Sequence, residues 1–148
     1  MSVTTEHTEC QRLSNLTEER IRQDLIDRLV WKWNFPSRLL IKERAIHQLP
    51  HFHQEGLKEG LPKDRRIDLL AYHWQKERLM PLVLFECKYA KPDKKAFQQL
   101  VGYNHWIQAP YLAWVSLEHE GLYRISKEGL IYLGAFQPFE DLCKLLTD

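Results

Sequence analysis

Two apolar runs joined by a short polar linker constrain the fold of this chain more than any other feature. Residues 66–73 (RIDLLAYH) and 82–88 (LVLFECK) have the length and composition of sheet strands. The linker between them, WQKERLMP, is short enough to return the chain in an antiparallel hairpin. We therefore expect two neighbouring, largely apolar strands in this part of the chain.

The residues before this hairpin show first a helical and then a strand pattern. Apolar residues recur at helical spacing over 17–34, which predicts an amphipathic helix. Residues 39–46 (LLIKERAI) are expected to form a strand. The segment 47–64, which is rich in Pro and Gly, is expected to be a long polar connection.

The residues after the hairpin continue the alternation. Asp93 is a candidate cap for a helix over 94–108, and a strand is expected over 111–117. Two further short strands and a terminal helix that starts near Pro138 complete the chain. This order of elements predicts an α/β fold in which helices flank a mixed β-sheet.

Length and composition indicate one globular domain. The 148 residues are enough for a single domain, and the apolar fraction of 44% is sufficient for a packed core. Residues 1–15 lack a periodic pattern, so we expect a flexible tail there, followed by one domain over 16–148. The formal charge of +1 favours no class of partner, so only a local basic cluster would indicate nucleic acid.

Several other functions are disfavoured by the sequence. No apolar stretch approaches the ~20 residues that span a bilayer, and the polar N-terminus is unlike a secretory signal. Cys10, Cys87 and Cys143 form no CxxC pair, which favours a reducing cytoplasm over disulfides. His51 and His53 form an HxH without a convincing third zinc ligand. No GxxxxGK[ST] sequence is present, so we expect no nucleotide-binding motor.

Three charged residues interrupt the two apolar strands. Glu86 and Lys88 share one face of the second strand, and Asp68 alternates with apolar neighbours in the first. A buried charge is costly unless it is paired or bound to a metal. Asp68, Glu86 and the backbone carbonyl of Cys87 offer the oxygen ligands that Mg²⁺ prefers, and Lys88 would orient or deprotonate a bound water. An ion-pair cluster without chemistry is the alternative on residue types alone.

The order of these residues resembles a known superfamily. Asp68, 17 intervening residues and Glu86-Cys87-Lys88 are similar to the D-x(n)-(D/E)-x-K signature of PD-(D/E)XK nucleases. Six segments resemble, in order, the N-terminal nuclease domain of type I restriction enzyme R subunits and its small stand-alone relatives: EERIRQDLIDRL, IKERAI, RIDLLAYH, PLVLFECK, FQQLVGYN and APYLAWVS. The likeness runs from about Thr17 to Ser116 and implies a restriction-endonuclease-like αβββαβ core.

The resemblance also implies roles for individual carboxylates. Asp68 and Glu86 would be metal ligands and Lys88 would be catalytic, with Mg²⁺ as the cofactor and Mn²⁺ as its substitute. Glu18 on the first helix would reach the metal directly or through water, whereas a carboxylate favoured by the helix dipole is the alternative. From its position in the strand pattern, Glu43 either approaches the same cluster or lies on the surface of an edge strand.

Further residues around the expected site would contact DNA. By resemblance, Gln99 would hold the attacking water or a phosphate oxygen, and Gln98 is the alternative if the helix phase differs by one residue. Tyr103, on the same helix, is either a site contact or core packing. A basic cluster would bind phosphates, and an ordinary solvated charge run is its alternative. The cluster comprises Arg65, Arg66, Lys91, Lys94 and Lys95.

The sequence therefore predicts a metal-dependent nuclease that hydrolyses DNA phosphodiester bonds. A non-catalytic nucleic-acid-binding or regulatory module that retains the nuclease fold is the alternative. DNA is the expected partner, with no membrane and no nucleotide, and a homodimer or a larger nuclease complex is left open. Two departures from the family are visible: residues 116–121 (SLEHEG) replace a T-N-G turn, and motor and assembly regions are absent, so ATP-driven restriction by this chain alone is not expected.

Overall fold

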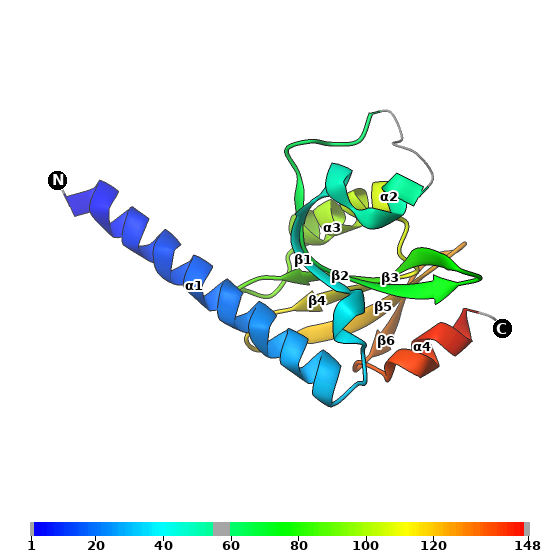
Figure 1. Ribbon diagram of the computed structural model, residues 1–148. Coiled ribbons are helices and arrows are strands. Elements are labelled where there is room, and N and C mark those ends of the chain that lie inside the picture. The colour runs from blue at the N-terminus through cyan, green and yellow to red at the C-terminus, as the bar shows by residue number, and fades with distance from the viewer. Residues whose placement is uncertain (1, 55–59, 147–148) are drawn as a thin grey trace.

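The structure is a computed structural model that describes residues 2–54 and 60–146, with side chains described from Thr17 onward except that of Gln54. Its centre is a six-stranded sheet in which the strands lie in chain order (Figure 1). The strands are β1 (Leu40–Ala45), β2 (Arg66–Gln75), β3 (Arg78–Cys87), β4 (Tyr111–Val115), β5 (Glu120–Ser126) and β6 (Gly129–Gly134).

One parallel pairing makes the sheet mixed. All neighbouring strands are antiparallel except β3 and β4, which run side by side in the same direction. Parallel neighbours need a crossover, and helix α3 (Lys94–Ile107) supplies it. The expected α/β fold with a mixed sheet between helices is confirmed.

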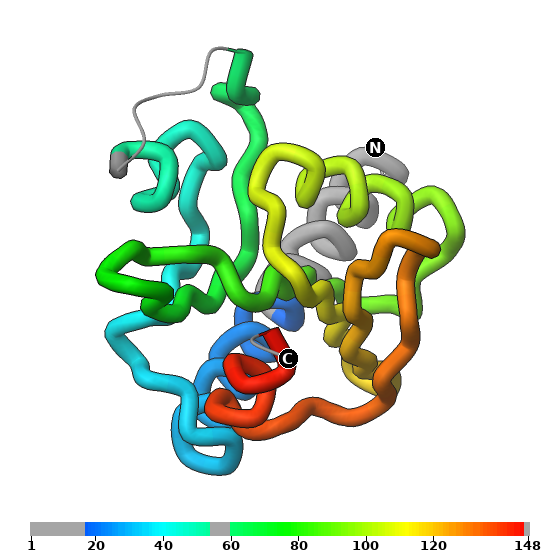
Figure 2. Tube along the Cα trace, turned by 90° about the vertical axis from the view of Figure 1, so that its right-hand side faces the viewer, coloured from blue at the N-terminus to red at the C-terminus, as the bar shows by residue number. Residues whose placement is uncertain are grey.

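Helices cover both faces of the sheet and create two layers of core. Helix α1 (Ser2–Trp31) and helix α4 (Phe139–Leu145) pack on one face, where Leu25, Leu29 and Leu142 are buried. Helix α3 packs on the other face together with the short helix α2 (Pro50–Gln54). Figure 2 shows α1 and α4 close together below the sheet and α3 above it. No helix in the described part of the chain is long and apolar enough to cross a membrane.

Helix α1 begins earlier than the periodic pattern indicates. It runs over Ser2–Trp31, whereas the sequence predicts a helix over 17–34 after a loose tail over 1–15. The stretch from residue 2 to residue 31 contains neither Gly nor Pro, so no residue breaks the helical backbone even where the apolar stripe is missing. The periodicity locates the part of the helix that packs on the sheet, not the start of the helix.

The connection after β1 contributes more apolar side chains to the core than its polar composition indicates. It contains the 3-10 helix η2 (Ile46–Gln48) and helix α2, and a second 3-10 turn, η1 (Ser37–Leu39), precedes β1. Leu49, Phe52 and Leu61 are buried in the core above the sheet. The expectation of a purely polar connection over 47–64 is therefore wrong for these three side chains, and residues 55–59 lie outside the described residues.

The hairpin between β2 and β3 is tighter than expected. Gln75 pairs with Arg78, so only Lys76 and Glu77 form the turn, and both have positive φ, +49° and +67°. Two-residue turns of this conformation match the right-handed twist of antiparallel strands. The linker residues expected between the strands therefore mostly belong to them.

The expected cap of α3 is confirmed. The Asp93 side chain accepts a hydrogen bond from the Ala96 backbone N–H at 2.7 Å, which satisfies one of the free donors of the first turn. The helix ends at Gln108, whose φ of +62° turns the chain toward β4. Asn104 fixes this turn because its amide exchanges two hydrogen bonds with the Ala109 backbone.

We expect the packing of α1 on the sheet to be a large contribution to stability. Leu25 is completely buried between helix and sheet, so Leu25→Ala should lower the free energy of unfolding by about 2–5 kcal/mol. Trp31, at the end of the same helix, is 84% exposed, and Trp31→Ala should change it by less than about 0.5 kcal/mol. Urea unfolding monitored by circular dichroism measures both, and equal effects of the two substitutions would contradict this packing.

Candidate active site

The pairing of β2 with β3 brings Asp68 and Glu86 together. Leu69 pairs with Phe85 in antiparallel register, so the next residues, Asp68 and Glu86, lie opposite each other. The Asp68 side chain is 26% exposed and that of Glu86 is 13% exposed. The two carboxyl groups are close enough to share a hydrogen bond. Two acidic groups therefore meet in a largely desolvated place at the end of the sheet.

A backbone hydrogen bond holds the Asp68 carboxylate in this position. The Cys87 N–H donates to Asp68 Oδ2 at 2.9 Å. The Cys87 side chain points to the opposite face and is buried in the core beneath α1. Burial, followed by the charges of Asp68 and Glu86, raises the pKa of its thiol far above the ordinary range. The Cys87 side chain is therefore core packing and not a nucleophile.

Burial and a like charge control the ionisation of Glu86. Desolvation raises its pKa to about 8, and the neighbouring charge of Asp68 adds to the rise. Lys88 Nζ lies 3.4 Å from Glu86 Oε1 and opposes part of this shift. Partial burial would lower the pKa of Lys88, but the surrounding carboxylates outweigh it and raise that pKa above its usual value.

Arg22 connects the cluster to two strands. Its Nη2 donates to Glu43 Oε1 at 2.8 Å, and its Nη1 lies 3.9 Å from Asp68 Oδ1. Arg22 comes from α1, and its side chain is only 12% exposed. Arg22 lies one helical turn after Glu18, and its link to Glu43 and Asp68 could not be seen in the sequence because it joins segments far apart in the chain.

Glu43 has an unusual backbone conformation inside a strand. Its φ is +50°, although it lies in β1 between Lys42, which pairs with Leu69, and Arg44, which pairs with Ile67. Positive φ is uncommon for residues other than glycine and tends to occur where surrounding contacts enforce it. Glu43 thus touches the cluster through Arg22, which the sequence offered as one of two interpretations.

Glu18 is within electrostatic range of the site. Its charge contributes to raising the pKa values of Lys88 and Cys87. Among the described residues, no ion pair joins Glu18 to Lys88. The side chain is half-buried on α1, one turn before Arg22. Its expected role as a metal ligand therefore stays a prediction.

The expected polar residues of α3 make no hydrogen bond to Asp68, Glu86 or Lys88 in the described part of the chain. Gln99 is exposed, as is Gln98, and within the described part of the chain Gln99 makes no hydrogen bond to Lys88. Tyr103 is half-buried and contacts Arg65, whose guanidinium donates to the Tyr103 hydroxyl at 3.2 Å and lies 5.6 Å from its ring centre. Tyr103 therefore contacts Arg65, and the Gln99 side chain is exposed to solvent.

The basic residues of the proposed phosphate-binding cluster divide into two kinds. Arg66 donates to the Glu43 backbone carbonyl at 2.8 Å, so it is engaged by the protein itself. Arg65 is exposed beside Tyr103. The lysines that follow β3 are exposed on the loop and first turn of α3: Lys91, Lys94 and Lys95.

The chemistry of the donor set fits Mg²⁺ better than zinc. In the described residues there is no group of three or more His, Cys, Asp or Glu side chains arranged to hold a metal. Magnesium is commonly bound by only one or two protein carboxylates, with water and phosphate completing its octahedron. Asp68 and Glu86 match that requirement. His51 instead pairs its Nδ1 with the Tyr72 hydroxyl at 2.8 Å, which leaves the HxH zinc interpretation without support.

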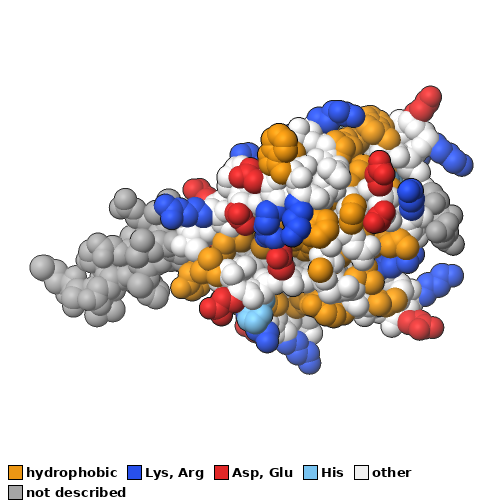
Figure 3. Space-filling view, turned by 90° about the horizontal axis from the view of Figure 1, so that it is seen from below, with side chains coloured by type: hydrophobic (Ala, Val, Ile, Leu, Met, Phe, Trp, Pro, Cys, Tyr) orange, Lys and Arg blue, Asp and Glu red, His pale blue; other side chains and the backbone are white. Residues whose placement is uncertain are grey.

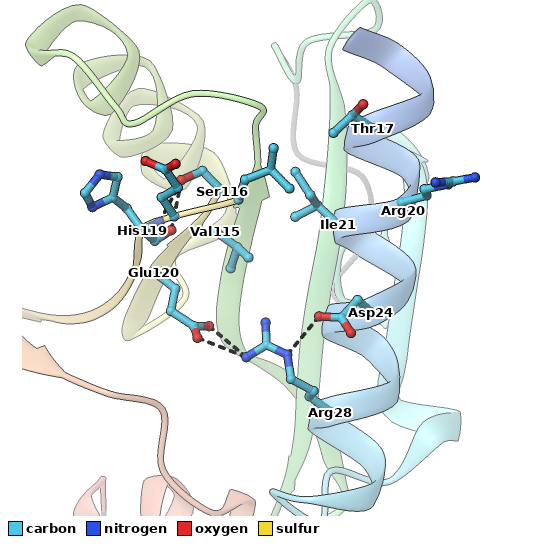
Figure 4. A pocket seen from close by; sticks show the side chains of 11 residues that line it. Thr17, Arg20, Ile21, Asp24, Arg28, Val115, Ser116, His119 and Glu120 are labelled. Carbon is cyan, nitrogen blue, oxygen red and sulfur yellow. Dashed lines mark hydrogen bonds and ion pairs between the residues drawn. The ribbon is translucent and has the colours of Figure 1, made fainter. Parts of the chain in front are cut away.

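A larger cleft lies on the other face, between α1 and the turn after β4. Its volume is about 530 Å³, and Arg28 crosses it (Figure 4). The Arg28 guanidinium donates to both carboxylate oxygens of Glu120 at 3.0 Å and to Asp24 at 3.0 Å. Arg28 is therefore held by two carboxylates, and Arg20, the other cation that lines the cleft, points away from it in Figure 4. The Arg28–Glu120 pair joins distant segments, so no local sequence pattern indicates it.

The face covered by α1 and α4 has no single sign of charge. Figure 3 shows acidic and basic side chains interspersed with apolar ones across it. This distribution agrees with the formal net charge of +1.

Comparison with known families identifies the family of this chain. Residues 17–133 match the family described as Type I restriction enzyme R protein N terminus, and the chain belongs to this family. The matched range includes α1 from its first described side chain, the whole sheet up to β6, and the Asp68–Glu86 pair. Searches of curated proteins and of solved structures gave no significant match.

The raised pKa of Glu86 predicts that stability without metal depends on pH. A carboxyl group whose pKa is higher in the folded than in the unfolded protein favours folding while it is protonated. Its contribution is complete below the ordinary value of 4.5 and is lost as the pH rises toward about 8. Wild type should therefore lose up to a few kcal/mol relative to Glu86→Gln between these limits, since one pKa unit corresponds to about 1.4 kcal/mol.

Urea unfolding of both proteins in EDTA from pH 5 to pH 8 measures this difference. The comparison cancels the contribution of His73, whose pKa is lowered by burial in both proteins. A difference between wild type and Glu86→Gln that does not change over this range would show that Glu86 ionises normally.

Proposed function

We propose that this chain is a metal-dependent nuclease of the PD-(D/E)XK type that hydrolyses DNA phosphodiester bonds. Membership of the restriction enzyme R N-terminal family supports a nuclease role. The order helix, three strands, helix, strand, from α1 through β4, supports a restriction-endonuclease-like core. The observation that carries the proposal is the meeting of Asp68, Glu86 and Lys88 at one end of the β2–β3 pair.

The carboxylate pair is the place where Mg²⁺ would bind. Asp68 and Glu86 would hold it, with the Cys87 carbonyl as a third oxygen and Glu18 as a ligand through water. A bound Mg²⁺ would supply Lewis-acid stabilisation of the phosphate and a more acidic water. Because the pKa of Glu86 is raised, a divalent cation bound there would displace a proton near neutral pH. Mn²⁺ would substitute because it accepts the same oxygen ligands.

Lys88 is the proposed catalytic residue. Its Nζ reaches Glu86 at 3.4 Å, and its side chain is 45% exposed, so the ammonium can face both the pair and solvent. In this position it can orient the attacking water, take or give its proton, or neutralise charge on the phosphate. Gln99, which is exposed on α3, would hold the attacking water or a phosphate oxygen.

Neighbouring cations would bind the DNA backbone. Three lysines follow β3 within a few residues of Lys88: Lys91, Lys94 and Lys95. Arg65 immediately precedes β2, the strand that carries Asp68. Each phosphate contact releases counterions, so affinity for DNA should fall steeply with salt. A cytoplasmic nuclease acting alone, as a homodimer or within a larger complex would all use this surface.

One observation favours a second candidate, a non-catalytic DNA-binding or regulatory module. Arg22 and Lys88 place two positive charges beside Asp68 and Glu86, so the cluster can be balanced without a metal. A protein that used the cluster only as an ion-pair network would bind DNA without cleaving it. Metal binding and cleavage separate the two candidates.

We expect Lys88→Ala to lose DNA cleavage by at least about a hundredfold while metal binding remains, since general acid–base groups commonly contribute this much. Lys88→Arg should also be poor, because a guanidinium does not give up a proton at neutral pH. Cleavage of linear, nicked, branched and single-stranded DNA in Mn²⁺ is the measurement, with Lys144→Ala on α4 as the control. If Lys88→Ala cleaves as well as wild type, this face is not the active site.

We expect divalent cations to raise the melting temperature, because they bind only the folded site. Asp68→Asn should remove this rise, whereas Asp141→Asn, an exposed carboxylate on α4, should keep it. Differential scanning fluorimetry with Mg²⁺ and Mn²⁺ measures the response. A rise that survives Asp68→Asn would place the ion elsewhere. A rise that depends on Asp68 but comes without cleavage of any substrate by wild type would favour the binding module.

A further inference from the structure

We propose that a small aromatic pocket beside the carboxylate pair binds an unpaired nucleobase of the DNA strand, so that the preferred substrate has single-stranded character near the scissile phosphate. This inference rests on the proposed nuclease function and gives that site a substrate class. The pocket has a volume of about 190 Å³. Its main lining residues are Lys91, Trp114, Glu120, Gly121, Tyr123 and Tyr132.

The register of the sheet places this pocket next to the proposed catalytic residues. Glu86 on β3 pairs with Trp114 on β4, and Trp114 pairs with Gly121 on β5. Paired residues point to the same face, so Glu86, Trp114 and Gly121 form one row across the sheet. Neighbouring strands are ~4.8 Å apart, which puts Gly121 about 10 Å from Glu86. A nucleotide adjacent to the scissile phosphate can span this separation.

The aromatic side chains offer both a rigid support and an open stacking face. Trp114 is 3% exposed and forms the buried side of the pocket, whereas Tyr132 is 63% exposed. The Tyr123 and Tyr132 rings lie 5.2 Å apart at 51°, and Phe97 of α3 supports Tyr123 from behind at 4.9 Å. Bases stack on such exposed rings with little dependence on sequence.

A glycine is needed at the floor of the pocket. A Cβ added to Gly121 would lie 2.9 Å from Tyr132 Cε1 and 3.6 Å from the Tyr123 ring. The Tyr132 ring therefore rests directly over the bare backbone of β5. Any larger residue at position 121 would push this ring away from its present place and change the shape of the pocket.

The polar groups suit a nucleotide as well. Trp114 Nε1 donates to the Ala90 carbonyl at 3.4 Å, which ties the loop after β3 to the pocket and keeps Lys91 at its rim. Lys91 follows Lys88 by three residues, so one cation lies at the proposed active site and the next at the pocket. Glu120 also lines the pocket, but Arg28 binds both of its carboxylate oxygens, which reduces its repulsion of a phosphate.

Binding without cleavage tests the pocket separately from the nuclease proposal. The parent for the test is Lys88→Ala, and the readout is fluorescence anisotropy of labelled DNA in buffer without divalent cations. The probes are a single-stranded oligonucleotide, a strand of the same length made only of abasic sites, and a blunt duplex. The parent should bind the base-bearing strand most tightly, because only that strand offers unpaired bases together with phosphates.

Tyr132→Ala in this parent should weaken binding of the base-bearing strand by roughly fivefold to a hundredfold. This range is the fold-change in affinity that corresponds to the stacking of one base on an aromatic ring. Binding of the abasic strand should change by less than about twofold, because the lysines are kept. Tyr132→Phe retains the ring and should retain the affinity. Gly121→Ala should weaken the base-bearing strand selectively, as Tyr132→Ala does, because it displaces the Tyr132 ring.

The matched control is Trp74→Ala, an aromatic residue that is 58% exposed on the hairpin, about 20 Å along β2 from Asp68. It should leave all three affinities unchanged. Equal binding of the base-bearing and abasic strands by the parent, tighter binding of the duplex, or unchanged discrimination in both Tyr132→Ala and Gly121→Ala would overturn the pocket. If wild type never cleaves DNA while base discrimination depends on Tyr132, the nuclease proposal fails and the pocket stands.

Discussion

The close approach of two carboxyl groups on neighbouring strands is the constraint around which the rest of this molecule is arranged. The register of β2 against β3 places Asp68 beside Glu86, and the Cys87 N–H holds Asp68 there. Two carboxyl groups this close disfavour each other's ionisation, and Lys88, which follows β3, and Arg22 from α1 supply nearby positive charge. The packing of α1 on the sheet therefore has an electrostatic consequence as well as a hydrophobic one, because it fixes where Arg22 can reach.

The parts of this arrangement that could be predicted from the sequence are those set by short-range periodicity. Alternation along a strand has a period of two, so the shared face of Glu86 and Lys88 follows directly from their spacing, and the short linker implies that Asp68 lies on the adjacent strand. The start of α1 could not be predicted, because polar residues without Gly or Pro extend a helix without an apolar stripe. The burial of Phe52 within a polar segment and the positive φ of Glu43 both depend on tertiary contacts that leave no local pattern.

The single parallel pairing determines which strand and which loop lie beside the site. Because β4 returns beside β3 in the same direction, both strands end at the same edge of the sheet, and the loop after β3 leaves from that edge. Trp114 thus lies beside Glu86, and its indole N–H holds the loop that carries Lys91. The sequence indicated a strand at this position but not its neighbour. Apart from Lys91, the pocket residues were therefore missed, although five of the eight that line it fall within the short span from residue 114 to residue 123.

The ionisation of Glu86 also bears on what the cluster is for. An ion pair that serves stability holds its carboxylate charged, which lowers the pKa of that group. Here the pKa of Glu86 is raised to about 8 although Lys88 lies 3.4 Å away, because burial and Asp68 outweigh the attraction. Two cations balance the formal charge of the pair but do not relieve the desolvation of Glu86. A divalent ion placed between the two carboxylates would relieve both the desolvation and the repulsion, since it replaces the lost hydration and binds both groups at once. The raised pKa of Glu86 is thus the electrostatic support for the metal site proposed above.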